Sequence, residues 1–352
     1  MTRRRPFFNG RQFRNHPEEE PPLFVLSSIG MYLKRWLTFQ QTSIQELHTW
    51  HNHQAISPSP LSNEHNKELT IVWIGHATFL IQHQNYTIIT DPVFESLTFL
   101  FPRLIAPGIQ RNDLPAIDAV YISHNHRDHL EQSTIEFLTA HSTCIFYVPQ
   151  GDEHWLQYWN VPRERIVTST WWDSHTIPSR RPTSQQATAT FLPAQHWSQR
   201  SWNDTNRSLW GSWMFTFEGH NIYFAGDTAY GPHFTEIADA FPEISCALMP
   251  IGPCEPAAYL KKSHLSAEES GIAFQQLRAQ TFIPMHWGTY GFGTEAPLLP
   301  LRRITAWWDH NDIPQQLIPL RMGIPCSLNL SPGHMKKTTR LSSSLATPSP
   351  LL

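Results

Sequence analysis

Apolar runs separated by turn-forming residues recur along the middle of the chain, and this pattern is typical of buried β-strands. We expect many of these runs to pair as hairpins, both early and late in the series. The runs that predict strands are LTIVWIG (69–75), TFLIQH (78–83), YTIITDP (86–92), AVYISH (119–124), CIFYVP (144–149), ATATFLPAQ (187–195), WMFTF (213–217), NIYFAGD (221–227), CALMPIG (246–252) and TFIPMHW (281–287).

Runs with a helical pattern fall between the later strands. They are STIEFLTAH (133–141), EHWLQYW (153–159), HFTEIADAF (233–241), SAEESGIAFQQL (266–277) and LPLRRITAWW (299–308). Ser266 followed three residues later by Glu269 predicts a capping box for a helix that begins at Ala267. Strands with interspersed helices predict an α/β sandwich built on mixed sheets, and not a simple doubly wound fold.

The two ends of the chain differ in composition from the middle. Residues 1–22 are basic, then acidic, then proline-rich, and residues 331–352 are rich in Ser, Thr and Pro, so both are expected to be poorly ordered. The pattern from Leu23 to Leu47 predicts one or two amphipathic helices in a helical N-terminal part, residues 23–50. We therefore expect one domain over residues 23–330.

Charge and composition limit the classes of partner. The formal net charge is -3 and only 16% of residues are charged, so no global attraction to nucleic acid is expected. The longest apolar run, Leu23 to Leu33, is well short of the roughly 20 residues that span a bilayer. Four scattered cysteines without a CxxC pair predict buried free thiols. We expect a cytoplasmic protein, with peripheral membrane contact and a homodimer both left open.

Metal-capable side chains follow four separate predicted strands. AVYIS leads into His124, TFLPAQ into His196, NIYFAG into Asp227 and TFIPM into His286. Strand ends are where a sheet scaffold brings distant side chains into one cleft. The stretch YISHNHRDHL adds further imidazoles and a carboxylate directly after the first of these strands.

Counting the candidate ligands tests this interpretation. A catalytic ion takes about three protein ligands plus water, so seven candidate ligands fit two ions that share one carboxylate. Nitrogen and oxygen ligands without thiolates suit zinc best, with iron or manganese as alternatives. Because the chain contains 20 histidines, surface clusters and buried hydrogen-bonded rings are the alternative explanation for any one of them. The candidate set is His124, His126, Asp128, His129, His196, Asp227 and His286.

These residues resemble a known family. HNHRDH matches the HxHxDH signature of the metallo-β-lactamase superfamily, and the later ligands follow in the order that the superfamily uses. The flanking text resembles the branch of N-acyl-phosphatidylethanolamine-hydrolysing phospholipase D and its bacterial relatives, across roughly residues 70–290. The stretches that carry this are WIGHATFLIQ (73–82), TDPVF (90–94), LPAQHWSQRSWNDTNRSLWGSW (192–213), FAGDTAYGPHF (224–234), MPIGPCEPAAYLKKSHLSAEES (249–270) and MHWGTYGF (285–292).

The resemblance implies a metallo-β-lactamase-type αββα four-layer sandwich with two zinc ions at one edge. It assigns His124, His126 and His196 to one ion, assigns Asp128, His129 and His286 to the other, and makes Asp227 the bridge. His264, in KSHLSAEE, falls where the phospholipase has a histidine that faces the substrate. The implied activity is hydrolysis of N-acyl phospholipids or related phosphodiesters.

The mechanism expected from the resemblance uses a water shared by the two ions. Two zinc ions lower the pKa of that water toward about 7, and the hydroxide would attack phosphorus in line with the leaving oxygen. Asp227 would orient the nucleophile, and His264 would contact the phosphate or assist proton transfer. His76 and Asp91 would orient ligands, as an alternative to turn chemistry.

Two further residues are candidates for substrate contact. Arg200 would meet an anionic phosphate, with a solvated loop charge as the alternative. Trp197 would line an apolar groove together with Trp202, Trp210 and Trp213, with core packing as the alternative for these rings.

Other functions remain open at this point. The same metal centre could serve a lactonase or another carboxyl-ester hydrolase, because it would activate water against a carbonyl. A nuclease is disfavoured by the acidic balance and the lack of a basic insertion. A non-catalytic zinc-binding, membrane-associated protein would not need the full ligand set.

Overall fold

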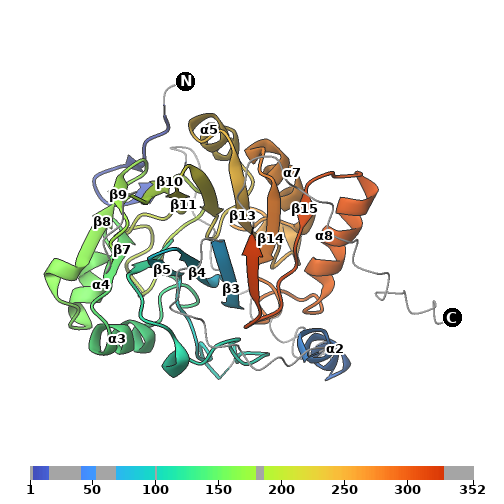
Figure 1. Cartoon of the computed structure of the whole chain (residues 1–352), viewed down its shortest axis with the longest axis horizontal. Helices are drawn as coiled ribbons and strands as arrows, with labels where there is room; N and C mark the ends of the chain where they lie inside the picture. The colour runs from blue at the N-terminus through green and yellow to red at the C-terminus, as the bar shows by residue number, and fades with distance from the viewer. Residues whose placement is uncertain (1–2, 16–40, 53–68, 100, 180–185, 329–352) are drawn as a thin grey trace.

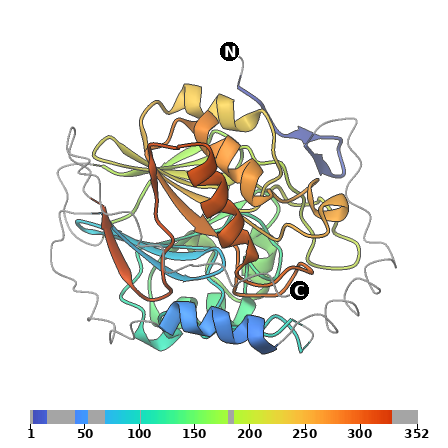
Figure 2. The same cartoon turned by 90° about the vertical axis from the view of Figure 1, so that its right-hand side faces the viewer.

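The computed structural model describes residues 3–15, 41–52, 69–99, 101–179 and 186–328. Most of the helical segment predicted between Leu23 and Leu47 lies outside these residues, as does the C-terminal segment 331–352. Helix α2 (Gln41–Asn52) is described, and it continues beyond Leu47. It lies along the lower edge of the molecule in Figure 2.

Two seven-stranded sheets form the centre of the protein. Each sheet has one antiparallel part and one parallel part, and the strands that come earlier in the chain form most of the antiparallel part. Sheet I has the order β16 (Pro325–Leu328), β3 (Leu69–Gly75), β4 (Thr78–His83), β5 (Tyr86–Thr90), β6 (Ala119–Tyr121), β7 (Ile145–Pro149) and β8 (Ile166–Ser169). Sheet II has the order β15 (Gln316–Leu317), β14 (Thr281–Met285), β13 (Ile244–Pro250), β12 (His220–Phe224), β11 (Ser212–Phe217), β10 (Thr188–Leu192) and β9 (Ser174–Thr176).

The mixed sheets were predicted, but the pairing of the late strands was not. Strands β12, β13, β14 and β15 run parallel, whereas the sequence pattern suggested hairpins there. Helix α5 (His233–Ala240) joins β12 to β13, and helix α7 (Ala267–Leu277) lies between β13 and β14. Parallel neighbours need such crossover connections, so the intervening helices account for the difference.

Helices cover the outer faces of both sheets (Figure 1). Helices α3 (Gln132–His141) and α4 (Glu153–Tyr158) lie beside sheet I, while α5, α7 and α8 (Leu299–His310) lie beside sheet II. The remaining short elements are α6 (Ala257–Leu260) and the 3-10 turns Arg111–Asp113 and Arg163–Arg165. This arrangement confirms the predicted αββα sandwich.

Strand β3 shows how the layers are held together. Ile71 and Trp73 pack between the sheets in the larger apolar cluster, which also contains Phe215 of sheet II. Val72 and Ile74 face the other way, into a cluster that includes residues of α3 and α4. Alternation places successive side chains on opposite faces, and each fully buried large side chain stabilises the fold by roughly 1.5–3 kcal/mol.

All four cysteines are free thiols. Three are buried as expected, whereas Cys326 on the edge strand β16 is only partly buried. Among the described residues, no helix has the length and apolar character needed to cross a membrane.

Residues 3–15, which fall in the segment predicted to be poorly ordered, form a hairpin of β1 (Phe7–Phe8) and β2 (Phe13–Arg14). The side chain of Phe13 is buried, at 5% exposure. The indole of Trp172 donates to the carbonyl of Arg4 over 2.6 Å. These contacts attach the hairpin to the body of the domain.

Candidate metal centre

The ends of strands from both sheets converge at one edge of the sandwich. His124 lies just beyond β6 of sheet I, while His196, Asp227 and His286 follow β10, β12 and β14 of sheet II. These four side chains are all nearly inaccessible to solvent. The structure therefore brings together the strand-end residues that the sequence singled out, along with His126, Asp128 and His129.

Three imidazoles form the first group. Nε2 of His124 lies 2.9 Å from Nδ1 of His126, and Nε2 of His196 lies 3.3 Å from the same atom. Nδ1 of His196 donates to the carbonyl of Ser263 over 2.8 Å, and Nδ1 of His124 lies 2.9 Å from the hydroxyl of Ser123. Nε2 of His124, Nε2 of His196 and Nδ1 of His126 therefore face one another.

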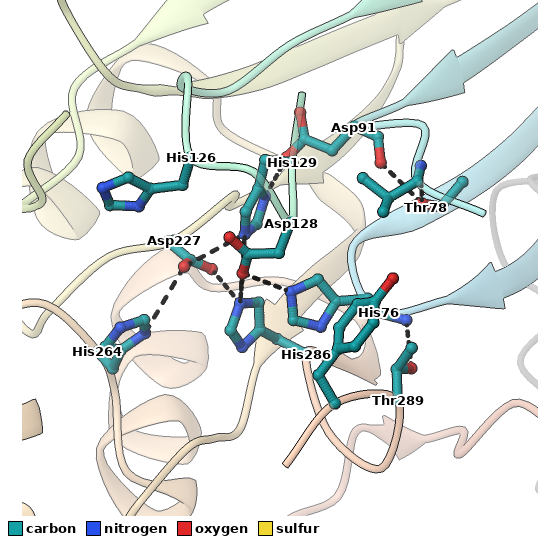
Figure 3. Close-up of polar contacts among 12 residues, drawn as sticks. His76, Thr78, Asp91, His126, Asp128, His129, Asp227, His264, His286 and Thr289 are labelled. Atoms are coloured by element: carbon teal, nitrogen blue, oxygen red, sulfur yellow. Dashed lines mark hydrogen bonds and ion pairs between the residues drawn. The ribbon is translucent and has the colours of Figure 1, made fainter. Parts of the chain in front are cut away.

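A second group surrounds Asp128 (Figure 3). Its Oδ2 lies 2.9 Å from Nε2 of His76, 3.4 Å from Nε2 of His129 and 3.7 Å from Nε2 of His286. The two nitrogens of His129 and His286 are 3.3 Å apart. His76, expected to orient a ligand, is thus the residue closest to this carboxylate among these three.

Asp227 lies between the two groups. Its Oδ2 is 3.8 Å from Nε2 of His196 and 3.3 Å from Nε2 of His129, and its Oδ1 is 3.0 Å from Nε2 of His286. Nδ1 of His264 approaches the same carboxylate at 3.7 Å, as Figure 3 shows. One carboxylate therefore faces nitrogens of both groups.

Hydrogen bonds behind the rings set the tautomers. Nδ1 of His129 donates to Asp91 over 2.7 Å, and Nδ1 of His286 donates to the carbonyl of Gly252 over 2.8 Å. Because a carbonyl only accepts, Nδ1 of His286 carries a proton, and Nε2 is the nitrogen that faces the centre and would bind a cation after losing any proton of its own. Asp91 also accepts from the backbone N–H and the hydroxyl of Ser123. The expected orienting role of Asp91 is consistent with these contacts.

The donor set fits divalent cations. Imidazole lone pairs and carboxylates converge at the centre, and four groups of three or more metal-capable residues are close enough to hold an ion. Burial opposes protonation of His286, yet Asp227 and Asp128 raise its pKa to about 9. Burial and the neighbouring His129 hold the pKa of His124 well below its usual range. Nδ1 of His264 is buried without a hydrogen-bond partner among the described residues. Nitrogen and oxygen ligands of this kind suit zinc, iron or manganese.

Three residues of the centre have left-handed backbone conformations. The φ angles are 56° at His76, 32° at Asp91 and 63° at His286. Such angles cost non-glycine residues of order 1–3 kcal/mol and persist where the surroundings hold them. The N–H of His286 donates to the carbonyl of His76, whose own N–H donates to the hydroxyl of Thr289. Strain of this type is concentrated at functional sites.

A family model described as the beta-lactamase superfamily domain matches residues 86–287. The chain belongs to the metallo-β-lactamase superfamily. The matched span includes all seven candidate ligands and His264.

The chain is similar in sequence to two proteins named as phospholipases D and to one mycobacterial protein. N-acyl-phosphatidylethanolamine-hydrolyzing phospholipase D 1 of Caenorhabditis elegans is 32% identical over 64% of this chain and 65% of its own length. The mitochondrial enzyme of the same name from Saccharomyces cerevisiae is 29% identical over 68% of this chain and 52% of its own. An uncharacterized protein of Mycobacterium tuberculosis is 33% identical over 68% of this chain and 63% of its own. The chain thus spans less than two thirds of the length of each relative.

Solved structures share the fold of this chain. Igni18, a metallo hydrolase from Ignicoccus hospitalis, has a TM-score of 0.56 at 17% identity and covers 75% of this chain and 99% of its own. An isothiocyanate hydrolase from Delia radicum gut bacteria has a TM-score of 0.58 at 17% identity, covering 74% of this chain and 100% of its own. Identities this low establish the shared architecture alone.

Arg200, which the sequence suggested for contact with a phosphate, binds main-chain carbonyls of the protein. Its Nη1 donates to the carbonyls of Asn125 and Leu130, at 3.2 and 2.6 Å, and its guanidinium lies 4.5 Å from the ring centroid of Trp159. Burial, with a smaller effect of Arg127, lowers its pKa to about 10. Arg200 therefore holds the loop that carries the superfamily signature.

The four tryptophans separate into three environments. The ring of Trp197 lies 4.4 Å from that of His126, at the edge of the centre. Trp210 and Trp213 are buried in the core, and Trp202 is fully exposed. Only Trp197 is in ring contact with a candidate ligand, so the four do not form one groove.

Some supporting residues were not recognised in the sequence. Ser123 contacts both Asp91 and His124, and Asn125 donates to Asp152 over 2.9 Å. Ser123 and Asn125 flank His124, so their position beside the signature was an available signal. No signal of this kind marked Asp152 in the sequence. In the structure, burial raises the pKa of Asp152 to about 8.

Proposed function

We propose that this protein is a dinuclear zinc phosphodiesterase of the phospholipase D type, acting on N-acyl-phosphatidylethanolamine-like phospholipids or related phosphodiesters. The observation that carries the proposal is the position of Asp227 between two groups of ligands, with His264 beside it. The names of the Caenorhabditis and Saccharomyces relatives support the substrate class.

The residues divide the proposed centre into two sites. Bound zinc ions would supply Lewis acidity and lower the pKa of a water molecule between them. One site would use the first group of imidazoles, the other the second group, and Asp227 would contribute to both. The first group is His124, His126 and His196, and the second is Asp128, His129 and His286.

The chain's own residues orient the reacting groups. Asp91 and Gly252 fix the rings of His129 and His286 from behind, so their Nε2 atoms face inward without reorganisation. The carboxylate of Asp227 accepts hydrogen bonds at the centre of the site and would orient the attacking water. His264, with 16% of its side chain exposed, lies toward the open side and would contact the phosphoryl group or transfer a proton.

Trp197 offers an apolar surface at the edge of the centre. Its ring packs edge-on against His126, and the residue itself is only partly buried. An acyl or alkyl portion of the substrate beside the phosphodiester would lie on this ring. Arg200 is not included in this role, because its guanidinium is bonded to the signature loop.

The proposed location is cytoplasmic, with peripheral contact to a membrane through the N-terminal segment. The exposed side chains of Phe7 and Phe8, at 41% and 50%, and the exposed arginines Arg3 and Arg5 support this idea. Flotation with anionic liposomes compares the full chain with a chain lacking residues 1–35. Equal flotation of the two would remove this segment from the proposal.

Metal analysis combined with a substrate panel tests the function. The panel contains an N-acyl-phosphatidylethanolamine, a soluble phosphodiester, a lactone and an RNA oligonucleotide. We expect two zinc ions per chain and turnover of the phosphodiesters. Turnover of the lactone alone, with zinc present, would replace the phosphodiesterase with a lactonase, and turnover of the RNA alone would indicate a nuclease.

The variant Asp227→Asn tests the dinuclear centre directly. We expect at least a 100-fold loss of activity, on the order of the loss of one preorganised charge-stabilising group, together with reduced zinc content. Asp239→Asn is a matched control, because Asp239 is exposed and pairs with Arg278 away from the centre. Full activity of Asp227→Asn would exclude the proposed mechanism.

A further inference from the structure

The ligand His196 lies on a long irregular loop. Residues 193–211, between β10 and β11, contain no helix or strand and carry both His196 and Trp197. Loops longer than about 12–15 residues without secondary structure are uncommon in compact domains unless they have a function. A metal ligand must be held within a few tenths of an ångström, so this loop needs support from elsewhere.

The side chain of Asn15 provides that support. Its Nδ2 donates to the carbonyl of His196 over 2.6 Å, and its Oδ1 accepts from the N–H of His196 over 3.1 Å. The same oxygen accepts from Nε1 of Trp210 over 2.9 Å, near the other end of the loop. One amide group thus binds both backbone polar groups of a candidate ligand, as a neighbouring β-strand would.

The rest of the N-terminal hairpin binds the same loop. The N–H of Phe13 donates to the carbonyl of Asn206 over 2.7 Å, and Nε2 of Gln12 donates to the carbonyl of Thr205 over 2.9 Å. A salt bridge of 3.3 Å between Arg4 and Glu236 connects the segment to α5. The hairpin is drawn in dark blue in Figure 2. These contacts keep Asn15 in place.

We propose that Asn15 is a positioning residue for His196, and that the N-terminal hairpin is a working part of the metal centre. The inference rests on the proposed zinc site. The hairpin lies outside residues 86–287, which the family model matches, so the superfamily domain does not account for it. Loss of partners behind metal ligands typically costs 10–100-fold in metal affinity.

The expected effect is selective for one of the two ions. Asn15 contacts His196, which belongs to the group with His124 and His126. His129 and His286, in the other group, are anchored by Asp91 and Gly252 instead. Weakening the Asn15 contact should therefore loosen one zinc ion and leave the other in place.

The variant Asn15→Asp tests this. Aspartate has nearly the same shape and still accepts hydrogen bonds, but it cannot donate to the carbonyl of His196 and repels that oxygen. The matched control is Asn9→Asp, the same change in the same hairpin. Asn9 is exposed, and its Oδ1 only accepts from the N–H groups of Arg11 and Gln12. The uncharged variant Asn15→Ala serves if Asn15→Asp does not fold.

Three quantities are measured on the full chain. Mass spectrometry gives the zinc stoichiometry, chelator competition gives the zinc affinity, and thermal unfolding gives the midpoint of the metal-free protein. We expect Asn15→Asp and Asn15→Ala to bind one of two zinc ions about tenfold or more weakly, with Asn9→Asp behaving as wild type. Wild-type affinity at both sites, or an equal loss at both sites, would overturn the inference. A wild-type chain that binds no zinc would instead overturn the proposed function, and this inference with it.

Discussion

Asp91 and His129 form a fully buried pair in which Nδ1 of the imidazole lies 2.7 Å from Oδ2 of the carboxylate. Neither side chain is exposed to solvent. The carboxylate fixes the tautomer of His129 and leaves Nε2 free to face Asp128 and Asp227. Carboxylate–histidine pairs of this kind raise the basicity of a metal ligand.

Replacing Asp91 with asparagine should therefore weaken metal binding without removing a ligand. We expect a 10- to 100-fold loss of zinc affinity, because the amide cannot match the charge of the carboxylate and competes as a donor toward Ser123. Chelator competition measures the affinity. Asp173→Asn is the control, since Asp173 accepts from the N–H of Thr170 in a turn away from the centre. Equal affinities of the two variants would contradict the prediction.

His264→Gln should separate catalysis from metal binding. We expect turnover of the phosphodiester to fall by about 10²- to 10⁴-fold, the usual contribution of a proton-transfer residue, while two zinc ions remain bound. His264 is not needed to complete either proposed group of ligands. His310→Gln, on the exposed end of α8, controls for loss of an imidazole. Loss of zinc from His264→Gln would instead identify His264 as a ligand.

Asp152 should make the stability of the folded protein depend on pH. Burial raises its pKa to about 8, compared with 3.8 when unfolded, so the folded state binds the extra proton between these values. The contribution of Asp152 to the free energy of unfolding is therefore fully present below about pH 4. This contribution decreases as the pH rises toward 8, by up to about 1.4 kcal/mol per pH unit. Asp152→Asn removes the titrating group, so the stability of this variant relative to wild type should increase across the same window. Urea denaturation at several pH values measures the difference, and a pH-independent difference would contradict the prediction.

Removal of metal should lower both activity and thermal stability. A ligand that binds only the folded state stabilises it by roughly 4 kcal/mol when its free concentration exceeds Kd about 1,000-fold. Dialysis against a chelator should abolish hydrolysis and lower the thermal midpoint, and zinc should restore both. Magnesium serves as the control, because it prefers oxygen ligands. An unchanged midpoint and activity after verified metal removal would contradict the proposed centre.

The sequence by itself determined the long buried strands and most helices of the sandwich. All ten predicted strand runs contain strands, and the capping box at Ser266 and Glu269 is present at the start of α7. Long apolar runs identify these elements because each is buried on at least one face. Short elements such as β9 and β16 were missed, since apart from Leu328 their residues are exposed or only partly buried and carry little apolar signal.

The sequence also indicated which metal-capable residues would meet, because strand ends on one edge bring distant residues together. Only the tertiary structure decided the parallel pairing of the late strands, the contact of Arg200 with the signature loop, and the docking of Asn15 against His196. Asn15 and His196 are separated by 181 positions, and their bond depends on the backbone geometry of both segments. Local patterns report burial and periodicity, whereas hydrogen bonds between distant loops leave no periodic trace in the chain.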